Sequence, residues 1–130
     1  YEVYYITNRG EQYRRQTLKN LKELGFPNAV DDHLLLRTES SSKKARRDLV
    51  AEKNMIVMLI GDNLNDFSEV FEKKSIQERF DITDSMKDKF GKSFIVLPNP
   101  MYGEWEGALY DYNYSQTESV KNELRKNSLT

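Results

Sequence analysis

Two carboxylates stand directly after an apolar run in residues 55–67, MIVMLIGDNLNDF. Residues 56–60 predict a strand that is buried on both faces, as inside a parallel sheet. Gly61 permits a sharp turn, which leaves Asp62 and Asp66 at the carboxyl edge of the sheet, where open α/β folds bind ligands. Two acids at this spacing, leading into a helix, suit a hard divalent cation such as Mg²⁺. The alternative is a strand–turn–helix corner that uses Asp and Asn as turn and cap residues.

Residues at the end of the first predicted strand could bind a phosphate. Residues 3–7 form this strand, and Thr7-Asn8-Arg9 stand at its end, just before a helix. A hydroxyl at this point, together with the exposed amides of the next helical turn, can hold a phosphate oxygen. A plain Thr or Asn helix cap explains the same residues equally well.

Lys43 occupies an unusual position for a cation, the first residue of a predicted helix over residues 43–52. A positive charge there opposes the helix macrodipole and costs a few tenths to about 1 kcal/mol, an effect that an anionic neighbour would reverse. The alternative is a solvated basic face made with Lys44, Arg46 and Arg47, and we expect three of these four residues to belong to such a face. One of the serines at 40–42 is expected to cap the helix.

The order of patterns along the chain predicts an α/β fold with a mainly parallel sheet and right-handed crossovers. The predicted strands are residues 3–7, 34–36, 56–60 and 93–97. The first two predicted helices are residues 10–24, which Gly25 ends, and residues 43–52. Phe67, Val70 and Phe71 share a helical face after the two acids, and a short helix is expected within 73–90. A polar surface helix over 116–126 is expected to rest on Val120 and Leu124. Residues 98–107, which are rich in proline, glycine and aromatic residues, predict a loop.

Composition excludes several classes of function. The 130 residues suit one domain, 1–130, and 32% charged residues, 38% hydrophobic residues and a net charge of −1 are typical of a soluble globular protein. The near-neutral charge gives no support to nucleic-acid binding, and the basic segment 43–47 has no aromatic platform beside it. The absence of cysteine excludes disulfides and thiolate chemistry, and no P-loop signature is present.

A hydroxyl, an amine and two acids at successive strand ends form a phosphate-plus-Mg²⁺ site, and their order resembles motifs two, three and four of the haloacid dehalogenase (HAD) superfamily of phosphohydrolases. Five segments are similar to the class C acid phosphatases, bacterial cell-envelope or secreted enzymes that include a lipoprotein 5′-nucleotidase. These segments are YITNR at 5–9, SSKKARR at 41–47, GDNLNDF at 61–67, FGKSF at 90–94 and LPNPMYGEWEG at 97–107. The resemblance runs from residue 3 to about residue 110 and implies a Rossmann-like HAD fold, with helices on both faces of the sheet.

The resemblance also implies hydrolysis of phosphomonoesters in two steps, through an aspartyl-phosphate intermediate. Asp62 would ligate Mg²⁺, and Asp66 would lie in the second shell, where it orders metal-bound water or holds Lys43. Lys43 would neutralise the nucleophile and the phosphoryl oxygens, and Thr7 with the Asn8 amide would hold one oxygen. The predicted catalytic set is therefore Thr7, Lys43, Asp62 and Asp66.

Tyr102 is a predicted substrate contact, because an aromatic side chain beyond the carboxyl end of a strand can stack on a nucleotide base. The matching tyrosine of the nucleotidase members lies near the substrate. The alternative is that Tyr102 and Trp105 pack the loop onto the domain, which we favour for Trp105. His33, the single histidine, is interpreted as structural because no partner for acid–base chemistry can be placed beside it.

The chain departs from the family at the nucleophile. These enzymes attack phosphate with an Asp of an Asp-x-Asp-x-Thr motif at the end of their first strand, and this chain has no such motif. Asp31-Asp32 comes closest, but no buried strand leads into it and it follows motif two. We therefore expect the C-terminal part of a phosphatase, which lacks the nucleophile strand between the strands at 3–7 and 56–60. Both strands would then have an unpaired inner edge, so we expect this part to be unstable and inactive alone.

By resemblance, the expected substrates are small phosphomonoesters, with nucleoside 5′-monophosphates as one candidate, and the expected cofactor is Mg²⁺. The expected partner is the missing N-terminal segment, on the same or a separate chain, whereas homo-oligomer formation is left open. The family implies a location outside the cell or in the cell envelope, with lipoprotein anchoring as one form. The rival hypothesis is a non-catalytic HAD-like binding module, against which the full set of four site residues argues.

Overall fold

The computed structural model describes residues 1–129 and shows an α/β arrangement with parallel strand pairs, as predicted. The chain divides into two compact units, Tyr1–Ile56 and the residues from Val57 onward. Each unit contains one two-stranded parallel sheet. That residues 1–130 form a single domain stays a prediction. No helix within residues 1–129 combines the length and the apolar composition that crossing a membrane requires.

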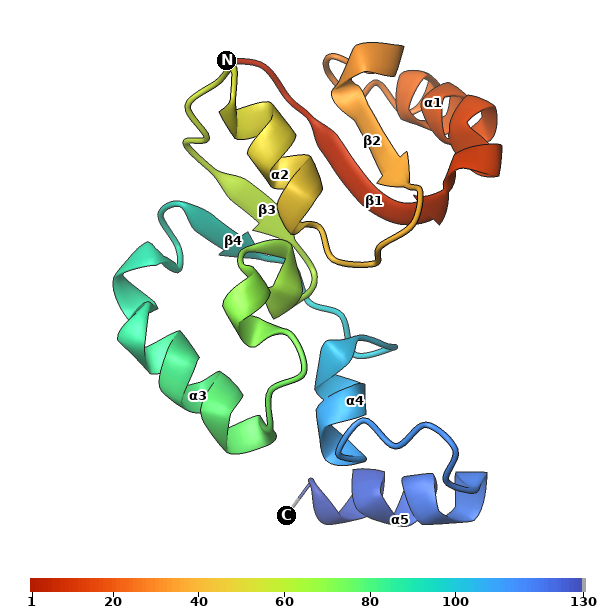
Figure 1. The fold of residues 1–130 in the computed structure, drawn as a ribbon, viewed down its shortest axis with the longest axis vertical. Helices are drawn as coiled ribbons and strands as arrows, with labels where there is room; N and C mark the ends of the chain where they lie inside the picture. The colour runs from red at the N-terminus through yellow and green to blue at the C-terminus, as the bar shows by residue number, and fades with distance from the viewer. Residues whose placement is uncertain (130) are drawn as a thin grey trace. The chain divides into compact units, whose positions relative to one another are not determined.

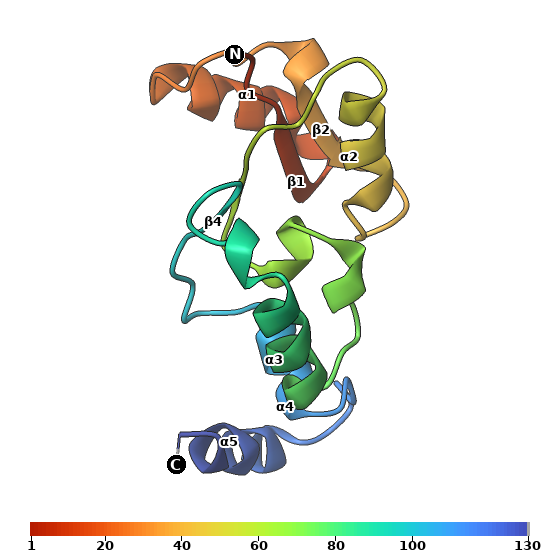
Figure 2. The same cartoon turned by 90° about the vertical axis from the view of Figure 1, so that its left-hand side faces the viewer.

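The first unit is built on a parallel strand pair that lies between two helices. Its elements are β1 (Tyr5–Gly10), α1 (Arg14–Glu23), β2 (Leu34–Arg37) and α2 (Lys44–Ala51). Figures 1 and 2 show α1 and α2 on opposite sides of the β1–β2 pair. Leu34 and Leu36 of β2 point into the interior and are 2% and 3% exposed. Gly25 ends α1 as predicted, because its left-handed φ of 74° lets its N–H donate to the Lys22 carbonyl.

The first strand begins and ends later than predicted, over residues 5–10 in place of 3–7. The backbone of Val3 is occupied elsewhere, since its N–H donates to Asn28 Oδ1 at 3.1 Å and its carbonyl lies 2.9 Å from His33 Nδ1. The His33 ring also stacks on Tyr4, with 4.2 Å between the ring centroids. The structural interpretation of His33 is therefore confirmed.

The second unit has an aromatic core beside its strand pair. Its main elements are β3 (Leu59–Gly61), α3 (Ile76–Ser85), β4 (Phe94–Val96), α4 (Glu104–Leu109) and α5 (Glu118–Asn127). Phe67 and Phe71 are 3% and 0% exposed, and the ring of Phe67 stacks on that of Phe94 at 5.0 Å. These rings anchor the chain that follows β3 against the strand pair. The predicted strand at 93–97 is confirmed as β4, although the observed strand is only three residues long.

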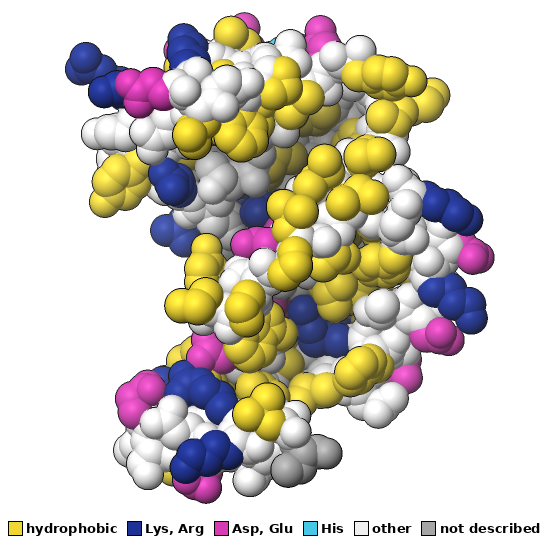
Figure 3. Space-filling model, turned by 180° about the vertical axis from the view of Figure 1, so that it is seen from behind, with side chains coloured by type: hydrophobic (Ala, Val, Ile, Leu, Met, Phe, Trp, Pro, Cys, Tyr) yellow, Lys and Arg dark blue, Asp and Glu magenta, His cyan; other side chains and the backbone are white. Residues whose placement is uncertain are grey.

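The prediction of a strand at 56–60 buried on both faces is wrong for the described chain. The observed strand β3 covers residues 59–61, and Val57, Met58 and Ile60 are 54%, 50% and 62% exposed. Burial on both faces requires covering elements on each face, and within residues 1–129 the only strand that pairs with β3 is β4. Hydrophobic side chains are accordingly prominent on the molecular face that Figure 3 shows.

The prediction of a helical face just after Asp62 and Asp66 is also wrong. Residues 64–66 and 69–71 form two short 3₁₀ turns, η3 (Leu64–Asp66) and η4 (Glu69–Phe71). Ser68 separates them, because its backbone is extended (ψ 146°) and its hydroxyl accepts a hydrogen bond from the Val70 N–H. Val70 consequently points outward and is 44% exposed, whereas Phe71 is fully buried.

The C-terminal part contains one helix that was predicted as a loop. Residues 98–107 were expected to be irregular, but α4 begins at Glu104, directly after Gly103. The polar helix predicted at 116–126 is present as α5, over 118–127. Of the two residues on which this helix was expected to rest, Leu124 is half-buried, whereas Val120 is 47% exposed.

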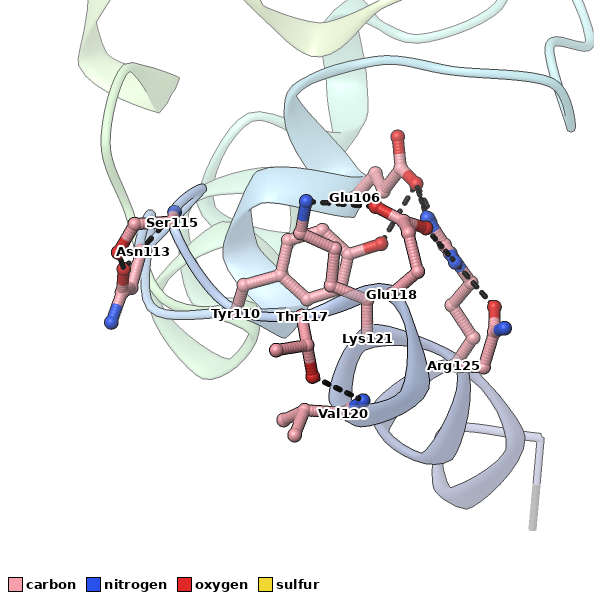
Figure 4. A network of polar contacts seen from close by, with 10 residues as sticks. Glu106, Tyr110, Asn113, Ser115, Thr117, Glu118, Val120, Lys121 and Arg125 are labelled. Carbon is pink, nitrogen blue, oxygen red and sulfur yellow. Dashed lines mark hydrogen bonds and ion pairs between the residues drawn. The ribbon is translucent and has the colours of Figure 1, made fainter.

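Polar contacts fasten α5 to α4 (Figure 4). Arg125 Nη2 lies 2.7 Å from Glu106 Oε1, which also accepts a hydrogen bond from the Tyr110 hydroxyl at 2.8 Å. The Arg125 guanidinium and the Lys121 ammonium both lie near the face of the Tyr110 ring, at 5.5 and 5.9 Å from its centroid. The Arg125 contact lowers the pKa of Glu106 most, and the Tyr110 hydroxyl lowers it further.

Candidate functional site

The predicted phosphate-binding residues Thr7 and Asn8 lie within β1 (Tyr5–Gly10), whereas they were predicted at the end of the strand. Thr7 lies in the stretch where the β1–β2 register is irregular, between Ile6 and Gly10. Its hydroxyl oxygen accepts a hydrogen bond from the Arg9 N–H at 3.3 Å. The alternative, a Thr or Asn helix cap, is wrong, because Gly10 and Tyr13 are the N-cap residues of the helical segments that follow. A hydroxyl that accepts one hydrogen bond still has its own hydrogen to donate, which is what a phosphate oxygen requires.

Arg46 of α2 connects this part of β1 to the loop before α2 by hydrogen bonds. Its side chain is only 9% exposed, and its guanidinium donates to the Thr7 carbonyl at 2.5 Å, to Asn8 Oδ1 at 2.6 Å and to the Ser42 carbonyl at 3.0 Å. Burial is the main cause that lowers the pKa of Arg46, followed by the charges of Arg37 and Arg47. The guanidinium remains protonated at any ordinary pH.

The expectation that three of the four basic residues form a solvated face is therefore wrong. Arg46 and Arg47 are 9% and 7% exposed and share the inward face of α2 with Val50. The helical spacing could have revealed this, because both arginines stand three or four residues before Val50. A planar guanidinium that donates to several carbonyls at once can be accommodated where a lysine could not.

Lys43 stands at the N-cap position of α2, which begins at Lys44. The predicted serine cap is wrong, because Lys43 is the N-cap residue and its side chain makes no capping hydrogen bond. Ser42 stands one residue earlier, where its Oγ accepts a hydrogen bond from the Lys44 N–H at 3.3 Å. Lys44 itself pairs with Asp48 at 2.6 Å on the surface. Lys43 is half-buried and belongs to the same unit as Thr7, Asn8 and Arg46.

Asp66 shapes the turn that follows β3. Its Oδ2 accepts hydrogen bonds from the N–H groups of Asp62 and Asn63, both at 3.2 Å. A Cβ at Gly61 would stand 2.5 Å from both Cβ and Oδ2 of Asp66, so this approach requires glycine. The cap chemistry that was the alternative for this segment is thus performed by Asp66, which leaves the exposed Asp62 side chain at the carboxyl end of the strand.

Asn99 is a functional candidate that sequence reasoning missed. Its Nδ2 donates to Asp62 Oδ2 at 2.8 Å, across 37 residues of chain. Its Oδ1 accepts from the N–H groups of Met101 and Tyr102, at 3.1 and 3.4 Å. The available signal was a single amide residue between two prolines at the end of a strand.

The Tyr102 side chain is displayed to solvent, whereas Trp105 is packed. Tyr102 is 68% exposed, as a residue that stacks on a ligand would be. Trp105 is half-buried, and its indole Nε1 is shielded from solvent. The packing interpretation of Trp105 is consistent with this arrangement.

The donor set around Asp62 fits a hard cation only in part. A carboxylate oxygen is the ligand type that Mg²⁺ prefers, and Mg²⁺ usually takes one or two protein carboxylates and completes its shell with water and phosphate oxygens. Within residues 1–129, no three Asp, Glu, His or Cys side chains gather into a metal-binding cluster. Asp62 would therefore supply one ligand to such a cation, and Asp66 and Asn99 make hydrogen bonds to its backbone N–H and to its carboxylate.

The site residues fall into two groups, one in each unit. The first unit brings together Thr7, Asn8, Arg46 and the loop that carries Lys43. The second unit brings together Asp62, Asp66, Asn99 and the loop that carries Tyr102. That the predicted set of Thr7, Lys43, Asp62 and Asp66 meets around one phosphate stays a prediction.

Comparisons with known proteins agree with the motifs. A family model described as HAD superfamily, subfamily IIIB (acid phosphatase) matches residues 1–105. The structure of a class C acid phosphatase from Bacillus anthracis is 43% identical, with a TM-score of 0.90, over 98% of this chain and 53% of that one. A crystal structure of a class C acid phosphatase from the same organism with tungstate bound is 42% identical, with a TM-score of 0.93, over 99% of this chain and 54% of that one. The chain thus spans about half the length of the structures that it matches.

Proposed function

This chain belongs to the acid phosphatases of HAD subfamily IIIB, and we propose that it supplies the phosphate-binding and Mg²⁺-binding half of a phosphomonoesterase. The observation that carries the proposal is the turn after β3, where Asp66 binds the backbone and leaves the exposed Asp62 carboxylate at the strand end. Asp62 would hold Mg²⁺, which when bound would offset the negative charge of the phosphoryl oxygens.

The first unit would bind the phosphoryl group. The Thr7 hydroxyl and the backbone amide of Asn8 would donate to one phosphoryl oxygen, from a part of β1 that Arg46 holds by hydrogen bonds to both residues. Lys43 would place its ammonium beside the same group and offset its charge. Asp66 would support the metal ligand Asp62 indirectly, because its carboxylate accepts hydrogen bonds from the N–H groups of Asp62 and Asn63 and so orients the turn.

We propose that a segment outside residues 1–130 supplies the nucleophile. No Asp-x-Asp-x-Thr motif occurs in this chain, and the matched class C phosphatases are about twice as long. The nucleophilic Asp would form the aspartyl-phosphate, and its strand would cover exposed apolar side chains such as Val57 and Ile60. On this proposal, residues 1–130 alone do not hydrolyse phosphomonoesters.

The proposed substrates are small phosphomonoesters, with nucleoside 5′-monophosphates as the preferred class. The exposed Tyr102 supports this preference, because its ring is free of packing contacts on most of its surface and stands on the loop that contacts Asp62 through Asn99. The family suggests a location outside the cell or in the cell envelope, which remains part of the proposal.

The test is hydrolysis by the complete protein, compared with residues 1–130 alone. The complete protein is expected to release phosphate from p-nitrophenyl phosphate and from nucleoside 5′-monophosphates, and to lose this activity with EDTA and regain it with added Mg²⁺. Residues 1–130 alone are expected to release none. A complete protein that binds phosphate but hydrolyses no ester would instead favour a non-catalytic binding module.

A further inference from the structure

We infer that Asn99 is a positioning residue that couples the metal-binding carboxylate of Asp62 to the substrate loop that displays Tyr102. The inference rests on the proposed function, because it assigns a role to Asn99 only if Asp62 holds Mg²⁺ and Tyr102 contacts the substrate. Asn99 itself touches neither a phosphate nor a metal on this inference. It acts by holding two other groups.

The Asn99 side chain uses both ends of its amide on different partners. The NH₂ group donates to Asp62 Oδ2 at 2.8 Å, and the carbonyl oxygen accepts from the N–H groups of Met101 and Tyr102 at 3.1 and 3.4 Å. A single planar group therefore connects the end of β3 with the first turn of the loop. A carboxylate could not donate a hydrogen bond to Asp62, and a single hydroxyl could not reach both sets of partners. The planar amide of asparagine can do both, so asparagine is suited to this position.

The backbone holds Asn99 beside Asp62 before any ligand binds. The Leu97 N–H donates to the Gly61 carbonyl at 2.8 Å, which extends the β3–β4 pairing to the residues next to Asp62 and Pro98. Pro100 restricts the preceding residue to extended conformations. Little conformational freedom thus remains to be lost when the Asn99–Asp62 contact forms.

The contact has a direct chemical consequence at the carboxylate. With Oδ2 accepting from Asn99, the carboxylate plane and the direction of its oxygens are fixed. Hydrogen-bond partners of metal ligands typically change metal affinity by about 10- to 100-fold when they are removed. The same side chain orders the backbone that carries Tyr102, so metal binding and loop order are expected to influence one another equally in both directions.

The experiment uses the complete protein and the variant Asn99→Ala, with Asn113→Ala as the matched control. Asn113 makes a similar turn, in which its Oδ1 accepts from the Ser115 N–H at 3.2 Å, but it has no contact with Asp62. Mg²⁺ affinity is measured by calorimetry without substrate, and hydrogen exchange is measured at the Met101 and Tyr102 amides. Thermal unfolding of each variant checks that it is folded.

Asn99→Ala is expected to weaken Mg²⁺ binding by about tenfold or more and to speed exchange at the Met101 and Tyr102 amides. In the parent protein, Mg²⁺ is expected to slow exchange at these two amides, and Asn99→Ala is expected to abolish that response. The Mg²⁺ concentration for half-maximal rate should rise, while kcat at saturating Mg²⁺ changes by less than about tenfold. Asn113→Ala should leave all of these quantities unchanged.

A reciprocal variant, Asp62→Ala, removes the acceptor of the Asn99 amide without touching the loop. It is expected to speed exchange at the Met101 and Tyr102 amides even in Mg²⁺-free buffer. The inference is overturned if Asn99→Ala binds Mg²⁺ as tightly as the parent, or if the response of the two amides to Mg²⁺ persists in that variant. Failure of the proposed function looks different, because the parent protein itself would then show no Mg²⁺-dependent hydrolysis.

Discussion

The two segments that carry site residues, one within β1 and one after β3, are held by opposite charges. In the first unit, the Arg46 guanidinium donates to the carbonyls of Thr7 and Ser42. In the second unit, the Asp66 carboxylate accepts from the N–H groups of Asp62 and Asn63. A cation that binds the carbonyl oxygens of a segment leaves the hydrogen-bond donors of that segment available. An anion that binds the amide hydrogens of a segment leaves its acceptors available. The first environment suits an anion such as phosphate and the second suits a cation, as the proposed function requires.

The largest effect is expected from removing the cation ligand itself. Asp62→Asn in the complete protein should lower Mg²⁺-dependent hydrolysis by about 10³-fold, since a metal ion contributes several kcal/mol of charge stabilisation. Asp88→Asn, a change of the same kind at an exposed position of the second unit, should have no effect. Steady-state kinetics with and without added Mg²⁺ measures both. Near-normal activity of Asp62→Asn would show that the acceptor-rich turn after β3 takes no part in catalysis.

Variants of Arg46 test the donor-rich segment within β1. Arg46→Met leaves the carbonyls of Thr7 and Ser42 without their buried donor, so the free energy of unfolding should fall by about 3 kcal/mol, with a rise in KM for phosphomonoesters. Arg46→Lys should recover only part of the loss, because an ammonium cannot reach all the oxygens in one plane. Chemical denaturation of the complete protein measures the free energy of unfolding of each variant. Arg15→Met, on the exposed side of α1, is the control. Full rescue by lysine would show that charge alone matters.

The acceptor-rich turn can be disturbed without changing any charge. Gly61→Ala places a methyl group 2.5 Å from Asp66 Oδ2, which must move the carboxylate away from the two N–H groups that it binds. The free energy of unfolding is expected to fall by about 2 kcal/mol, with weaker Mg²⁺ binding. Gly10→Ala is a fair control, since the new methyl group meets only the end of the flexible Gln12 side chain. Equal effects at the two glycines would contradict a specific role for the Asp66 contact.

The smallest effect concerns acid stability, at a carboxylate that caps α3 and takes no part in the site. The pKa of Glu78 is lowered to about 2, first by the Ser75 N–H and then by Lys74 and the Ser75 hydroxyl. Because the pKa in the folded state lies below the ordinary value of 4.5, this stabilisation is complete above about pH 4.5 and is lost as the pH falls towards 2. Glu78→Gln keeps a capping acceptor but cannot titrate, so its melting temperature should fall less steeply over this range. Parallel melting curves with Glu123→Gln separate this contribution from the general effect of acid.

Local patterns were enough to predict part of the fold and the chemistry of its motifs. The glycine end of α1 follows from short-range preferences and is present. The predicted serine cap of α2 is not, because Lys43 occupies the N-cap position. Arg46 was grouped with a solvated basic face, although its helical spacing from Val50 indicated an inward position. The Thr7 carbonyl that accepts its hydrogen bond lies on a distant strand, which no local pattern reveals. The Asn99–Asp62 contact joins residues 37 apart in the chain, which no local pattern can specify.

Burial was the least predictable property, because it depends on neighbours and not on the residues themselves. Ile60 belongs to a run as apolar as any core strand, yet it is 62% exposed within residues 1–129. The helix α4 was missed for a related reason, since Gly103 and Gly107 suggested a loop. Gly107 is instead buried in the helix, where a Cβ would stand 2.3 Å from the Tyr114 hydroxyl.

Gly103 constrains how the substrate loop can vary between related proteins. Its φ of 154° and ψ of −178° lie in a region that side chains strongly disfavour, and a Cβ there would stand 2.3 Å from Asn63 Nδ2. Asn63 directly follows Asp62, so a larger residue at 103 would push on the chain beside the proposed cation ligand. Natural diversity at position 103 should therefore be narrow, because a smaller residue at position 63 would remove the close contact but not the backbone strain.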